Sequence, residues 1–318
     1  MVKDHWTGRL AENITLCVFR HLQYCQFVAN SIDNSGGKYY CACGSDTFKF
    51  NCIILVASNS IVFKILMKAS RLMGKQQSYD YIVIGAGSAG AIVASRLSED
   101  SNCSVLLVEY GGGDGSVFVR MPSALGIPMN TKKYNWGFES APEPYLDNRR
   151  MNCPRGKVMG GSSSINGMVY VRGHALDFDE WESLGATGWN YQSCLPYFNK
   201  LENHQCVTSE YTGSEGPVAI SGGNNMRNPL YRAFIDAGVE SGYSETENYN
   251  GYRQEGFGQK FMNVDSGIRA SSSHAYLKDA KKRPNLTILK RALVTRVTFD
   301  GKTATGIECK IRGRLKNF

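Results

Sequence analysis

The sequence predicts an α/β fold with a parallel, doubly wound sheet, and three observations support this class. A β-branched and aromatic run of strand length, residues 79–84, leads directly into a glycine-rich turn. Small and apolar residues at helical spacing follow at 91–97, and a second apolar strand at 104–108 comes after a polar break. This strand, turn, helix and strand order is typical of the first unit of a Rossmann-like domain.

The turn after the first strand has the spacing G-x-G-x-x-G. Its first glycine permits a tight turn, the second lets the backbone approach a pyrophosphate, and the third lets the helix pack closely on the sheet. The helix N-terminus then offers free N–H groups and the positive end of its dipole to phosphates. The predicted cofactor contacts of this turn are Gly85, Gly87, Ser88, Ala89 and Gly90.

Glu109 ends the second strand, 19 residues after Gly90. Dinucleotide-binding units place an acidic residue ~20 residues after the last glycine, where it accepts hydrogen bonds from a ribose hydroxyl. Its charge would repel a 2′-phosphate, which disfavours NADP and leaves FAD or NAD. A solvated strand end is the alternative interpretation of Glu109.

The composition is that of a globular protein. The chain has 318 residues, of which 42% are hydrophobic, and a formal net charge of +8. At ~100–200 residues per domain, this length allows roughly two domains with a sizeable core. A disordered chain and a disulfide-stapled miniprotein are excluded. The 34 glycines show no three-residue period, which excludes collagen.

The charge is concentrated near the N-terminus. Residues 1–75 carry nine basic and four acidic side chains, so a net +5 of the +8 lies there. The basic composition is therefore weak evidence for a nucleic-acid surface on the remainder. The basic stretch 278–283 lacks interleaved stacking aromatics, so we expect no nucleic-acid partner.

Residues 1–72 are predicted to be a leader that is not part of the fold. Their most apolar stretch, 51–67, is interrupted by polar residues and is shorter than the ~20 apolar residues of a membrane span, so no span is expected. Their cysteines lack the paired spacing of a zinc site, so no metal is expected. A misassigned start before Met73 and a mitochondrial leader both remain open, and the location is either mitochondrial or cytoplasmic.

A second glycine-rich segment lies at 153–174. Gly160 and Gly161, followed by three serines, make a line of N–H and hydroxyl donors that suits a polar ring or a phosphate. Composition alone also allows a flexible loop.

This segment closely resembles the first signature of the glucose–methanol–choline (GMC) family of FAD-dependent alcohol oxidoreductases, and it is nearest to the choline dehydrogenases of that family. The resemblance covers about residues 79–312. It includes the stretches Tyr134–Trp136, Ala175–Trp181, Gly188–Tyr191, Cys194–Phe198, Glu255–Gly258 and the hairpin-like run Asn285–Val297.

The resemblance implies FAD as the cofactor and a role for individual residues. The glycine turn and Glu109 would hold the ADP half. Val294 would contact the adenine through its backbone, although an ordinary core valine is the alternative there and at Val158. After Glu109 this chain has Tyr110 where the family usually has alanine. The residues implied in FAD binding beyond the turn and Glu109 are Trp136, Val158, Gly160, Gly161, Ser162, Asn166, Gly167, Met168, Val169 and Val294.

The implied organisation is an FAD-binding domain from residues 79–175 and 284–312, with 176–283 as part of an α+β substrate domain. The implied partners are a small-molecule alcohol and an electron acceptor. Because much of the substrate domain's sheet would be missing, we expect exposed apolar surface and poor solubility.

The family's chemistry is hydride transfer from the carbinol carbon of an alcohol to the flavin, while a histidine base removes the hydroxyl proton. That base and its His or Asn partner lie near the family's C-terminus. None of the five histidines here has the matching context, so no catalytic residue is assigned. We therefore expect an N-terminal fragment of a flavoenzyme, with a non-catalytic FAD-binding or partner-binding remnant as the alternative.

Overall fold

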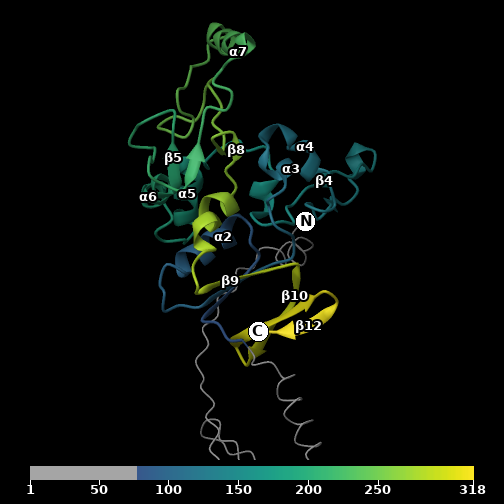
Figure 1. Cartoon of the computed structure of the whole chain (residues 1–318). Coiled ribbons are helices and arrows are strands. Elements are labelled where there is room, and N and C mark those ends of the chain that lie inside the picture. Colours follow the sequence, from purple (N-terminus) through teal and green to yellow (C-terminus); the bar gives the residue numbers. More distant parts are fainter. Residues whose placement is uncertain (1–76) are drawn as a thin grey trace, which may run out of the picture.

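The computed structural model describes residues 77–318. The predicted leader, its cysteines and its apolar stretch therefore lie outside the described residues. In the described part, helices and strands mix along the chain, which confirms the α/β class (Figure 1).

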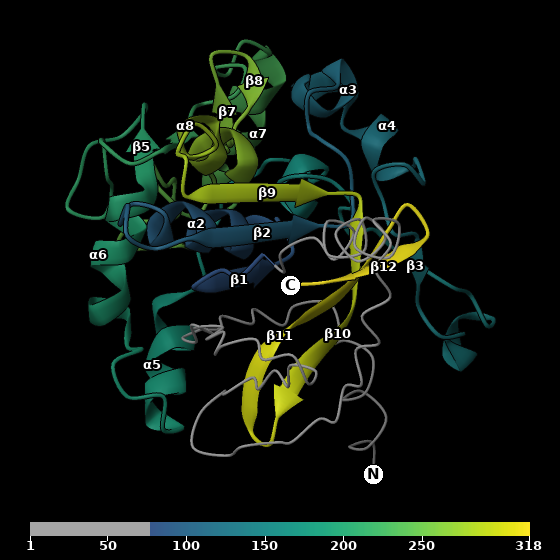
Figure 2. The ribbon, with the colours of Figure 1, turned by 60° about the horizontal axis from the view of Figure 1, so that its bottom comes forward.

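A three-stranded parallel sheet carries the predicted first unit. Its order is β1-β2-β9, and Figure 2 shows the three strands side by side. The helix between the first two strands, α2, begins within the glycine turn. The bounds are β1 (Tyr81–Ile84), α2 (Ser88–Leu97), β2 (Val105–Glu109) and β9 (Leu286–Lys290). The predicted strand, turn, helix and strand are all present.

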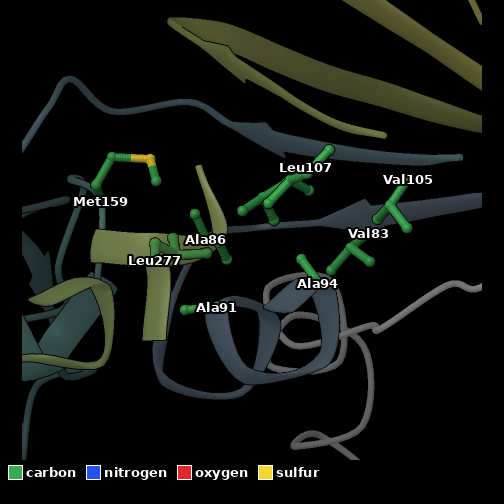
Figure 3. Packing of buried hydrophobic residues seen from close by; sticks show 10 residues of the cluster. Val83, Ala86, Ala91, Ala94, Val105, Leu107, Met159 and Leu277 are labelled. Carbon is green, nitrogen blue, oxygen red and sulfur yellow. The ribbon is translucent and has the colours of Figure 1, made fainter. Parts of the chain in front are cut away.

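Both faces of this sheet are buried, as expected for parallel strands with near-continuous apolar sequence. Every residue of β2 is buried. On one face, Ala91 and Ala94 of α2 pack against Val83 and Leu107 (Figure 3). A fully buried leucine contributes about 1.5–3 kcal/mol relative to an exposed one, so this layer is a main source of stability.

The opposite face is covered by a second, antiparallel sheet. Its strands are β10 (Ala292–Asp300), β11 (Thr303–Ile311) and β12 (Arg314–Asn317). Ile307 and Cys309 of this sheet pack against Ile82 and Leu106 of the parallel sheet. The hairpin-like run 285–297 is divided between two sheets: Arg291, at φ 57°, turns the chain between β9 and β10.

Residues 110–174 are mostly loops and single helical turns. The short elements are α3 (Val117–Arg120), η2 (Pro122–Ala124), α4 (Gly126–Met129), β3 (Phe138–Glu139), η3 (Pro144–Leu146), β4 (Asn152–Cys153) and η4 (Gly161–Ser164). The second glycine-rich segment thus contains one 3₁₀ turn, at Gly161–Ser164.

Residues 175–283 contain longer helices and short strand pairs. Their elements are α5 (Ala175–Ser183), α6 (Tyr191–Leu201), β5 (Glu202–His204), β6 (Val218–Ile220), α7 (Pro229–Glu240), β7 (Val264–Asp265), β8 (Ile268–Arg269), the π-helix η5 (Ser273–Leu277) and α8 (Lys278–Ala280). Side chains of His174, Asn190 and Asn228 cap α5, α6 and α7. Helix α7 lies at the opposite end of the molecule from β10 and β12 (Figure 1). No helix within 77–318 is long and apolar enough to cross a membrane.

Candidate dinucleotide site

The glycine turn has the geometry that its sequence predicts. Gly85 adopts φ 88° and its N–H donates to the Val108 carbonyl at 2.7 Å. A Cβ at Gly90 would collide with the Gly85 carbonyl, so only glycine allows the helix to start this close to the strand. Gly87 is the N-cap of α2, where neither a side-chain cap nor an acidic residue occupies the first turn. The first N–H groups of α2, including those of Ser88 and Ala89, remain available to an anion.

The second glycine-rich segment docks directly on this turn. The Gly160 N–H donates to the Ala86 carbonyl at 2.7 Å. A Cβ at Gly161 would lie 2.7 Å from the Cα of Gly87, and both glycines of this pair, Gly160 and Gly161, have positive φ. Two segments more than 70 residues apart therefore approach each other at a distance that only glycine permits. Ser162 accepts a hydrogen bond from the Gly156 N–H at 3.1 Å, which shapes the same loop.

Glu109 is buried, with only 7% of its surface exposed. Its carboxylate accepts hydrogen bonds from the Ala86 N–H at 2.9 Å and the Gly111 N–H at 2.7 Å. Burial raises the pKa of Glu109, and these two hydrogen bonds partly offset the effect. A solvated strand end, the alternative for this residue, is wrong.

The two valines implied in cofactor binding have buried or half-buried side chains. Val158 is fully buried and bridges to Gly112, whose carbonyl accepts from the Met159 N–H at 2.9 Å. Val294 is half-buried on β10 and packs against the cluster that contains Leu106. The core role weighed for both valines is therefore present.

Residues 166–169 form an open edge beyond the 3₁₀ turn. Asn166, Gly167 and Val169 are exposed, whereas Met168 is buried. The Met168 backbone is left-handed at φ 63°, and its N–H donates to Oδ1 of Asn166 at 3.1 Å. Among the described residues, none accepts a hydrogen bond from the N–H groups of Gly167 and Val169 or from Nδ2 of Asn166. The edge therefore offers three donors to a ligand.

Trp136 lies in an aromatic stack. Its ring stacks on Tyr110 at 5.0 Å between centroids and on Phe138 at 6.0 Å. The Lys157 ammonium lies 5.7 Å from the Trp136 ring and 5.9 Å from the Tyr110 ring. Because Tyr110 directly follows Glu109, the stack continues the predicted ribose end of the site.

Residues 269–272 support the site, and the sequence did not predict this role. Ser272 donates its N–H to the Ser163 hydroxyl at 3.0 Å, and its hydroxyl lies 3.4 Å from the Gly87 and Gly160 carbonyls. Arg269 donates to carbonyls of the same loop. The serine run 271–273 is the only sequence signal for this support, and nothing local shows what it contacts.

The site fits a dinucleotide. Glycines occupy the positions where a Cβ would collide with neighbouring backbone. Glu109 is buried, and no cationic side chain contributes to the shift of its pKa. The edge 166–169 presents donors from which no residue in the described part of the chain accepts a hydrogen bond. Within residues 77–318, no group of three or more His, Cys, Asp and Glu side chains could hold a metal ion.

The parallel sheet, the glycine turn and the acidic end of β2 define an α/β dinucleotide-binding protein. More specifically, the chain belongs to the GMC oxidoreductase family, whose model matches residues 79–318. This confirms the resemblance seen in the motifs. GMC oxidoreductases bind FAD, and the solved relatives include an FAD-dependent oxidoreductase from Chaetomium thermophilum, so the family confirms FAD over NAD.

The similar proteins of known name are oxidoreductases. The oxygen-dependent choline dehydrogenase of Vibrio vulnificus is 59% identical over 242 residues, which are 76% of this chain and 43% of that protein. Its Photobacterium profundum counterpart is 54% identical over 241 residues, covering 76% of this chain and 42% of that protein. The chain thus spans less than half the length of these curated relatives.

Solved structures show the same fold. Pyridoxine 4-oxidase from Mesorbium loti superposes with a TM-score of 0.70 at 32% identity, over 74% of this chain and 46% of that chain. Formate oxidase from Aspergillus oryzae superposes with a TM-score of 0.69 at 28% identity, over 76% of this chain and 43% of that chain.

Proposed function

We propose that this chain holds FAD in the site described above and that the protein oxidises the CH–OH group of a small alcohol. Choline is the first substrate to test, because the relative at 59% identity is named a choline dehydrogenase. The observation that carries the proposal is that the glycine turn, Glu109 and the Gly160–Gly161 loop contact one another at one site.

Each part of the chain has a distinct task in this proposal. The Glu109 carboxylate accepts from ribose hydroxyls, and the N-terminal N–H groups of α2 hold the pyrophosphate. The backbone of Val158 and the edge 166–169 lie along the flavin, and the backbone of Val294 reaches the adenine. When bound, FAD supplies the acceptor for the hydride that leaves the carbinol carbon. Dioxygen is the first electron acceptor to test, since the relatives are named oxygen-dependent.

We also propose the division into an FAD-binding domain, 79–175 with 284–312, and part of a substrate domain, 176–283. The parallel pairing of β9 with β2 supports it, because this pairing joins both stretches of the first domain in one sheet. The position of α7, far from both large sheets, supports a separate second part (Figure 1).

A non-catalytic FAD-binding or partner-binding role is the second candidate. Each of the three histidines within 77–318 interacts with groups outside the candidate site. His174 caps α5, His204 accepts two backbone N–H groups through Nδ1, and His274 lies 3.2 Å from Asp265. None of these three histidines forms a hydrogen bond with the edge 166–169, which favours a chain that binds the cofactor without supplying the base.

The test is to purify the whole chain, saturate it with FAD and measure flavin absorbance and fluorescence. We expect one FAD per chain and no NAD; a chain that takes up NAD and not FAD would refute the cofactor assignment. Anaerobic mixing with choline then separates the two candidates. Bleaching of the flavin band indicates a complete active site, whereas bound FAD that choline does not bleach indicates the non-catalytic role.

A further inference from the structure

Arg269 is a buried cation with an unusual set of partners. It is only 2% exposed, on the short strand β8. Its guanidinium donates to the carbonyls of Val119 at 2.9 Å and Asn166 at 2.7 Å, and more weakly to that of Ser163 at 3.3 Å. No carboxylate in the described residues forms an ion pair with it, and burial lowers its pKa to about 10. Burying a cation without a counter-ion costs free energy, so a functional role would explain why Arg269 is placed against the Ser163 and Asn166 carbonyls.

The same guanidinium fixes the orientation of one side-chain amide. Nη1 of Arg269 donates to Oδ1 of Asn166 at 2.9 Å, and the Met168 N–H donates to the same oxygen at 3.1 Å. Both partners are donors only, so the atom that faces them must be the amide oxygen. The nitrogen, Nδ2, therefore points away from Arg269, where no described residue accepts from it.

The backbone beside this amide is also held in a costly conformation. Met168 has φ 63°, which costs a non-glycine residue of order 1–3 kcal/mol. Strain of this kind persists where surrounding structure imposes it, and it concentrates at ligand-binding sites. Here the Asn166 oxygen holds the Met168 N–H, and Arg269 holds Asn166. Arg269 thus holds the Asn166 amide directly and, through it, the left-handed backbone at Met168.

We propose that Arg269 is a positioning residue for the flavin: it turns the Asn166 amide so that Nδ2 donates to the isoalloxazine ring. This inference rests on the proposed FAD site and adds to it a residue that never touches the cofactor. The chemical class of the contact is a neutral N–H donor to a ring oxygen or nitrogen of the flavin.

The sharpest test is Asn166→Asp. The aspartate keeps an acceptor for both Arg269 and the Met168 N–H, and it gains an ion pair with Arg269, so the fold is retained. It replaces the outward donor with an anionic acceptor. We expect FAD affinity to fall at least tenfold, about the effect of one lost hydrogen bond to a cofactor, and the flavin reduction potential to become more negative. Unchanged affinity and potential would overturn the proposal.

A second test addresses Arg269 itself, with Arg269→Lys and Arg269→Gln. Lysine retains the charge but cannot span the three carbonyls, so we expect a partial loss of FAD affinity with lysine and a larger one with glutamine. Arg283→Gln is the matched control, because Arg283 also donates to a backbone carbonyl, that of Ser95, at the far end of α2. The control is expected to bind FAD as the wild type does.

The double variant distinguishes positioning from general support. If Arg269 acts through Asn166, the effects of Arg269→Gln and Asn166→Asp on FAD affinity are less than additive, even where their effects on unfolding add. Fully additive effects on affinity would overturn the proposal. A wild-type chain that binds no FAD would overturn the proposed function as well, whereas normal FAD binding by every variant would overturn only the role of Arg269.

Discussion

At Glu109, burial and two backbone hydrogen bonds set the pKa of the carboxylate. Burial raises its pKa above the usual value of 4.5, while hydrogen bonds from the Ala86 and Gly111 N–H groups act in the opposite direction. A carboxyl group with a raised pKa accepts its proton at a higher pH than an ordinary glutamate does. In the proposed site, its ability to accept hydrogen bonds from ribose hydroxyls is therefore lost at a higher pH during acidification.

This gives a pH prediction. In the proposed site FAD binds the ionised form of Glu109, so we expect the affinity to be fully present above the raised pKa and to fall as the pH drops through it, beginning above pH 4.5. Glu109→Gln removes the titration. We expect its affinity to be about tenfold weaker at neutral pH and flat over the same pH range, as measured by flavin fluorescence titration. A wild-type affinity that does not change with pH in this range contradicts the assignment.

A second residue-scale prediction concerns Gly161. In Gly161→Ala the added Cβ lies 2.7 Å from the Cα of Gly87, at a backbone φ of 54°. Both the collision and the strain act, so we expect a loss of about 1–3 kcal/mol in unfolding free energy and loss of FAD binding. Gly115→Ala is the control, because a Cβ at that position has nothing within 4 Å; its change is expected to stay within about 0.5 kcal/mol. Equal effects of both variants, measured by urea unfolding, would exclude the close-approach explanation.

The residues of the site differ in how far sequence alone could predict them. Gly85, Gly87 and Gly90 lie in one short motif whose spacing has a direct structural cause, so they could be predicted locally. Arg269 could not, since its partner Asn166 is about 100 residues away and no local pattern records that contact. Tyr110 is notable in the sequence only because the family usually has alanine there. Its stacking on Trp136 could not be predicted, because the two residues are far apart in the sequence.

At the scale of elements, a buried ion pair joins the edge 166–169 to the second part of the chain. Arg172, three residues after this edge, donates to the Glu202 carboxylate on β5, and Tyr170 donates to the same oxygen. Both charges are nearly inaccessible to solvent. Asn250 accepts from the Arg172 N–H at 2.8 Å, so the backbone here is held as well as the side chains. Residues 170–172 are therefore fixed relative to β5.

Removing one partner of this ion pair should lower the free energy of unfolding more than removing both partners. Glu202→Gln leaves the Arg172 charge buried without a counter-ion, and we expect a loss of about 3–5 kcal/mol in unfolding free energy. The double variant Arg172→Met with Glu202→Leu removes both charges and should recover part of that loss. Chemical denaturation of the wild type and the two variants measures the difference; a double variant less stable than Glu202→Gln would show that the hydrogen bonds, rather than charge balance, dominate.

Elements with a strong local pattern were predictable, and those defined by distant pairing were not. The run 79–84, the glycine turn and the strand ending at Glu109 form β1, α2 and β2, because apolar periodicity and glycine placement are local. The stretch 285–297 resembles a hairpin in sequence, but β9 completes the parallel sheet and only β10 enters the antiparallel one. Two adjacent β-rich runs look alike in sequence whether they pair with each other or with different sheets.

At the scale of the whole molecule, large apolar side chains remain exposed on and directly after two helices, α7 and α5. On α7 and the residues after it, Leu230, Phe234 and Tyr243 are each more than 60% exposed. Around α5, Leu176 and Leu184 are exposed to a similar degree. Exposed apolar side chains of this size promote association.

We therefore expect the purified chain to self-associate, with a mean mass by light scattering that rises with concentration. Replacing Leu184 and Phe234 together by serine should lower that mass at equal concentration, because both side chains are exposed and contribute little to the core. Replacing Tyr252, which is 91% exposed but polar at its tip, by serine is the control. A monomeric wild-type chain at all concentrations would contradict this expectation.

The pairing of β9 with β2 has a consequence for how the protein is made. Val105 pairs with Leu286, so the third strand of the parallel sheet leaves the ribosome long after the glycine turn and Glu109 have emerged. Closing a connection of that length is entropically slow, and parallel pairing adds to the delay. The nascent chain thus carries its glycine turn on an incomplete sheet until β9 has been made. For the FAD site proposed above, we expect cofactor loading only after translation has passed Lys290.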